Sequence, residues 1–187
     1  MRLKDVAKVS LICAATIIRA DPSAAAEETG GSLFKEALLG HCYLAVTGNT
    51  FMKTTINVSS WKQVVSSEGK GPGGLTANAR VKATPSGDVI VDRTRDGCFV
   101  QAINVDSASV SEIVRAALQE PPFGAVLYDD KTREAPGAPR RRSTVFFVVS
   151  SPGDTAPMIV VNEFFPPAPG VVTGHVALGR KAPAKSP

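Results

Sequence analysis

The segment SLFKEALLGHCYLAV, residues 32–46, decides the fold of this chain because it combines an apolar helical face with a cysteine. Its composition predicts a helix over residues 33–44, with Ser32 as the N-cap. One face of that helix carries apolar residues at intervals of four, namely Phe34, Leu38 and Cys42. The side of the helix that we expect to be buried therefore presents a thiol.

A second cysteine lies in the segment GCFVQAINV, residues 97–105, which predicts a strand. Side chains alternate along a strand, so Cys98, Val100 and Ala102 share one face. These side chains are small, as a strand face must be when a helix lies close over it. We therefore predict a disulfide between Cys42 and Cys98 that ties the first helix to a sheet. On the chain-entropy model, closing this loop contributes roughly 4 kcal/mol of stability.

The first 26 residues resemble a secretory signal peptide. A basic start is followed by an apolar run from Val9 to Ile18 and then by small residues that end at Ala26. The run is shorter than the ~20 apolar residues that span a bilayer. We expect cleavage after Ala26, which removes Cys13 and leaves two cysteines in the mature chain. The alternative is that this segment is the amphipathic first helix of a cytosolic domain.

Export would place the mature chain in the periplasm or outside the cell, where oxidising conditions favour a disulfide. We expect a single domain over residues 27–180 and a flexible tail over residues 181–187. Loss of four basic and two acidic leader residues lowers the formal charge from +4 to +2. With only 6% aromatic residues, we expect no nucleic-acid binding. No later apolar stretch is long enough to span a membrane.

Downstream of the first helix the sequence predicts mostly strands. Residues 77–84 and 89–94 form an expected hairpin, and residues 107–120 form a second helix with a Ser109–Glu112 capping box. The apolar stripe of this helix consists of Val110, Ile113, Val114, Ala117 and Leu118. Four more strands are expected over residues 124–129, 143–150, 157–165 and 171–180. The apolar residues in 49–70 fit neither the period of a helix nor that of a strand. Trp61, which lies in this segment, is interpreted as a core residue.

Together these patterns predict an α+β fold in one domain. The expected sheet is antiparallel, with about six or seven strands and two main helices. A helix followed by strands occurs twice, but no repeat at the residue level accompanies it. Asp88, Asp92 and Asp96 recur every four residues, and we interpret them as charges on a solvated edge strand.

The strongest local feature is DDKTREAPGAPRRRS, residues 129–143, which we expect to contain a loop of about a dozen residues. Its basic residues are Lys131, Arg133, Arg140, Arg141 and Arg142. One interpretation is a solvated hairpin tip. The other is a contact site for an anionic partner, either a protein or an anionic component of the cell envelope such as a glycan or lipid head group.

The sequence lacks the motifs that are typical of several enzyme classes. The chain contains no nucleophile elbow, P-loop, dinucleotide fingerprint or zinc-protease motif, and we expect neither a metal nor a cofactor. We therefore expect an exported, non-enzymatic binding protein such as an inhibitor, an immunity-type protein or an envelope accessory factor. Two alternatives stay open. One is a hydrolase-like enzyme whose site assembles from His175, Tyr128, Asp129 and Glu163, and the other is a structural envelope component.

Overall fold

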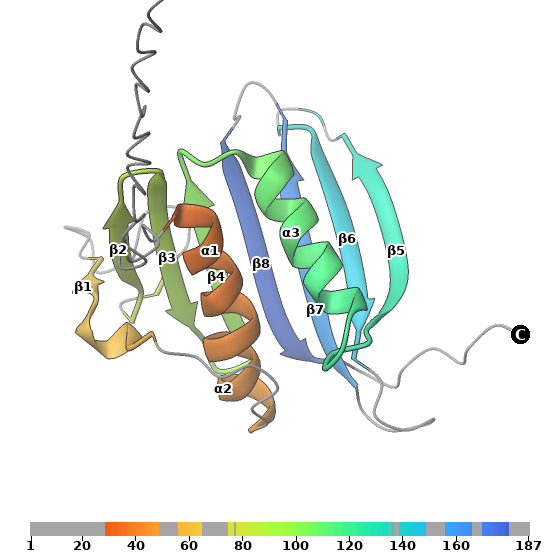
Figure 1. The fold of residues 1–187 in the computed structure, drawn as a ribbon, viewed down its shortest axis with the longest axis horizontal. Helices are drawn as coiled ribbons and strands as arrows, with labels where there is room; N and C mark the ends of the chain where they lie inside the picture. The colour runs from red at the N-terminus through yellow and green to blue at the C-terminus, as the bar shows by residue number, and fades with distance from the viewer. Residues whose placement is uncertain are drawn as a thin grey trace, which may run out of the picture.

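In a computed structural model of the protein, the described residues are 29–48, 56–64, 75–76, 78–134, 136, 139–148, 156–165 and 170–179. The predicted leader and the predicted tail lie outside them, as do parts of the unassigned segment 49–70. The described chain forms one antiparallel sheet of eight strands, with its helices packed on one face (Figure 1). The other face of the sheet is called the open face below.

The helices and strands have the following bounds. The first helical segment consists of α1 (Gly30–Lys35), a π-helical stretch η1 (Glu36–Cys42) and α2 (Tyr43–Thr47), and it is followed by the 3-10 turn η2 (Val58–Ser60). The second helix is α3 (Ser107–Gln119). The strands are β1 (Lys62–Gln63), β2 (Arg80–Thr84), β3 (Gly87–Arg93), β4 (Cys98–Ile103), β5 (Val126–Arg133), β6 (Arg141–Phe147), β7 (Pro157–Phe164) and β8 (Val171–Leu178).

The first helix starts earlier than predicted. Thr29, not Ser32, is the N-cap: its hydroxyl accepts a hydrogen bond from the Ser32 amide at 3.1 Å, and Ser32 reciprocates as the third residue of a capping box. The predicted face is confirmed, because Phe34, Leu38 and Cys42 are all fully buried. Capping by a Thr-x-x-Ser pair thus moves the helix start without changing the face that it buries.

The predicted disulfide between Cys42 and Cys98 is present, with 5.2 Å between the two Cα atoms. It joins η1 to β4, and both cysteines have no solvent exposure. The helix also approaches the neighbouring strand β8 closely. A Cβ atom at Gly174 would lie 2.6 Å from the Leu38 methyl groups, so a larger residue there would force Leu38 to move.

The strand order β1-β2-β3-β4-β8-β7-β6-β5 divides the molecule into two halves. Each half consists of a helical segment followed by four strands that pair with their neighbours in sequence, and the halves meet at the β4–β8 pair. Both helical segments cover the same face of the sheet (Figure 1). The repeated helix-then-strands order therefore has a counterpart in the fold, although the residues themselves show no repeat.

The second helix also differs in its cap. Asp106 is the N-cap of α3 and accepts hydrogen bonds from the amide and hydroxyl of Ser109, which the sequence had suggested as the cap. Val110, Val114 and Leu118 are buried as predicted, whereas Ile113 is 47% exposed. The stripe that packs on the sheet is therefore narrower than predicted.

The predicted strands are present with several changed bounds, and one strand is added. The eighth strand is β1, two residues long, within the segment that the sequence left unassigned. The interpretation of Asp92 as a solvated edge residue is wrong. Asp92 lies on β3, an inner strand, where it is 3% exposed and accepts a hydrogen bond from the Thr76 amide at 2.7 Å. A buried carboxylate is tolerated here because the backbone and hydroxyl of Thr76 both donate to it.

Candidate functional site

The outer edge of the first half contains a groove beside β2. The strand β1 covers only part of β2, since Lys62 pairs with Val81 and Gln63 pairs with Arg80. Just before β1, the chain leaves the sheet plane through the 3-10 turn Val58–Ser60. The rest of β2 therefore lacks an outer neighbour among the described residues.

The register shows which backbone groups of β2 are left open. The Val64 amide donates to the Ala79 carbonyl at 3.0 Å, which places Val64 and Ala79 at the position of a hydrogen-bonded pair, although the Ala79 amide donates to the Thr76 carbonyl. Such pairs alternate along an antiparallel ladder, so Val81 also points its N–H and C=O toward β1. Two residues further along β2, Ala83 points its N–H and C=O in the same direction, at a position that lies before the start of β1. Ala83 therefore presents one donor and one acceptor at the sheet edge.

These open groups lie beside a concave pocket with a volume of about 810 Å³, which is called the edge groove here. This volume lies in the range that is usual for ligand sites. The edge groove is lined by Ile56, Asn57, Ser60, Trp61, Lys62, Val81, Lys82, Ala83 and Asp88. One wall is thus the segment before β1, and the other wall is the uncovered part of β2.

Trp61 forms a rigid part of this wall. Its side chain is only 7% exposed and belongs to the main core cluster, as predicted for a core residue. Val58, in the same segment, is buried in that cluster, and Ile56 packs against it. On the open face of the same edge, Leu75, Ala79 and Ile90 form a second small core. Packing on both faces therefore holds the walls of the edge groove in place.

The charges around the edge groove are mostly positive. Lys62 is exposed and Lys82 is half-buried, while Asp88 on β3 is the acidic residue of the lining. Sequence reasoning missed this site because its walls come from the unassigned segment and from a strand that looked ordinary. The signal that was available was the lone tryptophan followed closely by a lysine.

The five predicted basic residues lie at the opposite edge of the sheet, and four of them belong to strands. The expected loop of about a dozen residues is wrong: β5 continues to Arg133 and β6 starts at Arg141. Asp129 lies 3.1 Å from Lys131 and 3.4 Å from Arg133, and Glu134 lies 3.0 Å from Arg140. Neighbouring carboxylates therefore neutralise much of the predicted basic surface.

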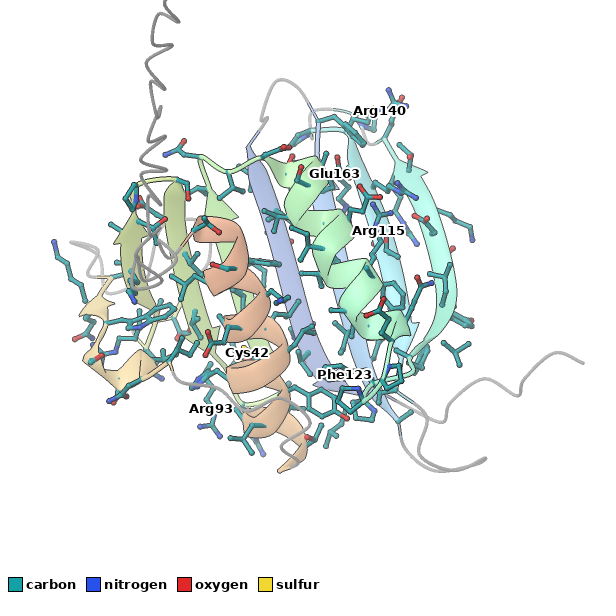
Figure 2. The ribbon with its side chains drawn as sticks, viewed as in Figure 1. Cys42, Arg93, Arg115, Phe123, Arg140 and Glu163 are labelled. Carbon is teal, nitrogen blue, oxygen red and sulfur yellow. A yellow bond between two sulfur atoms is a disulfide. The ribbon has the colours of Figure 1, made fainter. Side chains whose placement is uncertain are left out.

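Arg142 points to the helix side, where it forms a bidentate pair with Asp130 at 2.8 and 2.5 Å. Thr144 also donates to Asp130 at 3.2 Å, and Arg115 of α3 lies 3.9 Å away. The hydrogen bonds from Arg142 hold the pKa of Asp130 below its usual value. Glu163 is the cross-strand neighbour of Arg142 and is 7% exposed. These five residues are here named the ion cluster, and Figure 2 labels two of them, Arg115 of α3 and Glu163 of β7.

Arg141 is the remaining member of the predicted set. It is exposed and lies directly opposite Arg133 across the β5–β6 ladder. Within the described parts of the chain, no carboxylate is within salt-bridge distance of Arg141. The anionic contact site therefore stays a prediction that centres on this arginine pair.

The four residues of the predicted enzyme site are not brought together. His175 pairs with Phe99 and Val160 on the open face, whereas Glu163 points to the helix side. Tyr128 and Asp129 lie on β5, three strands from β8, a separation of roughly 14 Å at the usual strand spacing. Burial lowers the pKa of His175. Nothing in this arrangement aligns a carboxylate with the imidazole.

In the described ranges, no three histidine, cysteine or acidic side chains gather closely enough to bind a metal ion. No helix there combines the length and apolar character that a membrane span requires. Comparison with known proteins adds no assignment, because no family model, curated protein sequence or solved structure matches this chain.

Proposed function

We propose that the protein is an exported, non-enzymatic interaction module that binds an extended polypeptide segment of a partner in the edge groove. The observation that carries this proposal is the outward-facing N–H and C=O of Ala83 beside a rigid concave wall. Adding a strand to an uncovered edge satisfies such groups, and pockets along the edge then select side chains.

The chemistry of the lining supports a peptide over a small apolar ligand. Trp61, Ile56 and Val81 supply apolar surface, while Ser60 and Asn57 add polar groups beside it. Aromatic residues next to backbone hydrogen-bonding groups are typical of peptide-binding surfaces. Because the walls are packed into two cores, little ordering is needed when a partner binds.

The test uses the mature chain and a pool of random pentapeptides with free carboxyl ends. Peptides that stay with the protein in gel filtration are identified by mass spectrometry. Ala83→Pro removes the outward N–H but leaves the β2–β3 ladder intact, since proline is tolerated where its nitrogen faces away from the sheet. Ala83→Ser is the matched control, because it keeps the N–H.

We expect the wild-type protein and Ala83→Ser to retain the same peptides and Ala83→Pro to lose them. Circular dichroism and urea unfolding should show that all three proteins fold alike. Retention of an unchanged set of peptides by Ala83→Pro would contradict the proposed site, and so would a wild-type protein that retains none.

The exported location is part of the proposal and has its own test. Expression of the full chain in a bacterial host, followed by N-terminal sequencing of the product from the envelope fraction, should give a first residue of Glu27. A product that starts at Met1 in the cytosol would contradict export. The buried disulfide supports an oxidising compartment, since such bonds are rare in the cytosol.

A second contact, with an anionic partner, is favoured by the pairing of Arg133 with Arg141. Like charges directly opposite one another in a ladder are destabilising; Asp129 offsets the charge of Arg133 in part, and an anion bound at Arg141 would relieve the remaining repulsion. Arg141→Ser should reduce binding to vesicles that contain roughly 30–50% anionic lipid. Arg140→Ser is the control and should leave this binding unchanged, because Arg140 already pairs with Glu134. Equal vesicle binding by both variants and the wild-type protein would remove this contact.

A further inference from the structure

We propose that the edge groove selects the C-terminal residue of its partner; this inference rests on the proposed function. The uncovered part of β2 offers only one hydrogen-bonding position. The backbone N–H and C=O of Thr84 point toward β3, because the direction of these groups alternates along the strand. The next residue, Pro85, has no N–H. Ala83 alone therefore exchanges both backbone hydrogen bonds with an added residue.

The path of the protein's own chain limits what fits there. Trp61 and Lys62 occupy the ladder immediately beyond the open position, because Lys62 is already paired with Val81. An internal peptide segment that continued along β2 would meet these residues. A chain that ends opposite Ala83 avoids them.

The direction of an added strand decides which end of the partner chain lies opposite Ala83. β1 is antiparallel to β2, and a partner strand that pairs antiparallel with β2 runs in the direction of β1. It enters from the Thr84 side and ends against Trp61 and Lys62. Its last residue then donates its N–H to the Ala83 carbonyl, and its terminal carboxylate accepts the Ala83 N–H. A parallel strand would instead place an ammonium group at this point.

Charge favours the carboxylate. Lys62 and Lys82 line the end of the groove that the carboxylate would reach. Asp88 lies on β3, on the far side of Ala83, and is its direct cross-strand neighbour. The terminal side chain would lie over the Ala83 methyl group toward Asp88, so acidic side chains should be disfavoured at that position. Hydrogen bonds to a charged acceptor are about twice as strong as neutral ones.

The test compares one retained pentapeptide, synthesised with a free carboxylate and again with a C-terminal amide. Binding to the mature protein is measured by fluorescence anisotropy of an N-terminal label. We expect the amide to bind at least about tenfold more weakly, which corresponds to the loss of ~1.4 kcal/mol. Lys62→Gln should weaken binding of the free acid and leave binding of the amide nearly unchanged.

The outcomes separate the two proposals. Equal affinity for acid and amide, with both lost in Ala83→Pro, would overturn C-terminal selection and leave the peptide-binding function standing. Binding of neither form would overturn both. A free acid that binds equally well to the wild-type protein and to Ala83→Pro would show that its site lies outside the edge groove, which overturns the inference.

Discussion

The first half of the molecule fastens its helix covalently, whereas the second half uses charged side chains. The Cys42–Cys98 disulfide joins η1 to β4 in a fully buried contact. In the other half, Arg115 connects α3 to Asp130 on β5, and Arg142 joins the same carboxylate from β6. The strength of the disulfide does not depend on salt concentration or acid, whereas the strength of the ion pairs depends on both.

The outer edges of the halves differ in a related way. The edge strand β5 carries a bulge near Tyr128 and four charged residues, both of which discourage pairing with another strand. The edge at β2 is covered only by two residues and carries an exposed alanine at its open position. The charged edge strand β5 belongs to the second half, whereas the half that contains the disulfide has the edge groove at its outer strand.

The largest effect on stability should come from removing the disulfide. Cys42→Ala combined with Cys98→Ala should lower the free energy of unfolding by about 4 kcal/mol, because 56 residues separate the two cysteines. Urea unfolding at neutral pH measures this loss. A loss below about 1 kcal/mol would show that packing, not the covalent bond, fastens the first helix.

Proline substitutions at adjacent positions of β2 should differ sharply. Lys82→Pro removes an N–H that bonds to buried Val89, which should cost roughly 1–3 kcal/mol, whereas Ala83→Pro should cost less than about 0.5 kcal/mol. Urea midpoints of the two variants give the difference. The reverse order would mean that the register assigned to this edge is wrong.

Breaking the ion cluster should have a smaller effect. Arg142→Ala should lower stability by roughly 1 kcal/mol, because both members of the pair with Asp130 are partly exposed. Arg140→Ala, whose partner Glu134 is far more exposed, should change stability by only a few tenths of a kcal/mol (about 0.3). A double-mutant cycle with Asp130→Asn isolates the pair, and a coupling energy near zero would contradict its role.

The smallest expected effect is a decrease in the stability of the second half at low pH. The pKa of Asp130 is lowered by Arg142, so the contribution of the pair is complete above the ordinary value of 3.8 and is lost as the pH falls through the lowered one. The stability difference between wild type and Asp130→Asn should therefore shrink below pH 3.8. A difference that grows toward low pH would mean that Asp130 is destabilised in the fold.

The sequence predicted those parts of the structure that depend on periodic apolar residues. Phe34, Leu38 and Cys42 fixed the buried face of the first helix, and the alternation after Cys98 fixed its strand, so the disulfide could be predicted. The helix starts were harder to predict, because Thr29 and Asp106 cap their helices through local hydrogen bonds with Ser32 and Ser109, the two residues that the sequence pattern itself favoured as caps.

The candidate site could not be predicted, for a different physical reason. The edge groove exists because β1 begins only at Lys62, opposite Val81, and nothing in the sequence before Lys62 marks that start. Likewise, the burial of Asp92 depends on Thr76, sixteen residues away, and the pairing of Asp130 with Arg142 depends on strand register. Such contacts follow from tertiary placement, which local patterns do not encode.

The mirrored strand order has a consequence for how the chain can be divided. Every ladder joins strands adjacent in sequence except β4–β8, which pairs Cys98–Ile103 with Val171–Val176. A cut in the connector between Ile103 and Ser107 would leave two fragments, each with its own helix and meander, and the disulfide would lie wholly within the first. Reassembly would then depend on a single central ladder and the helix contacts above it, which suits the protein to fragment complementation.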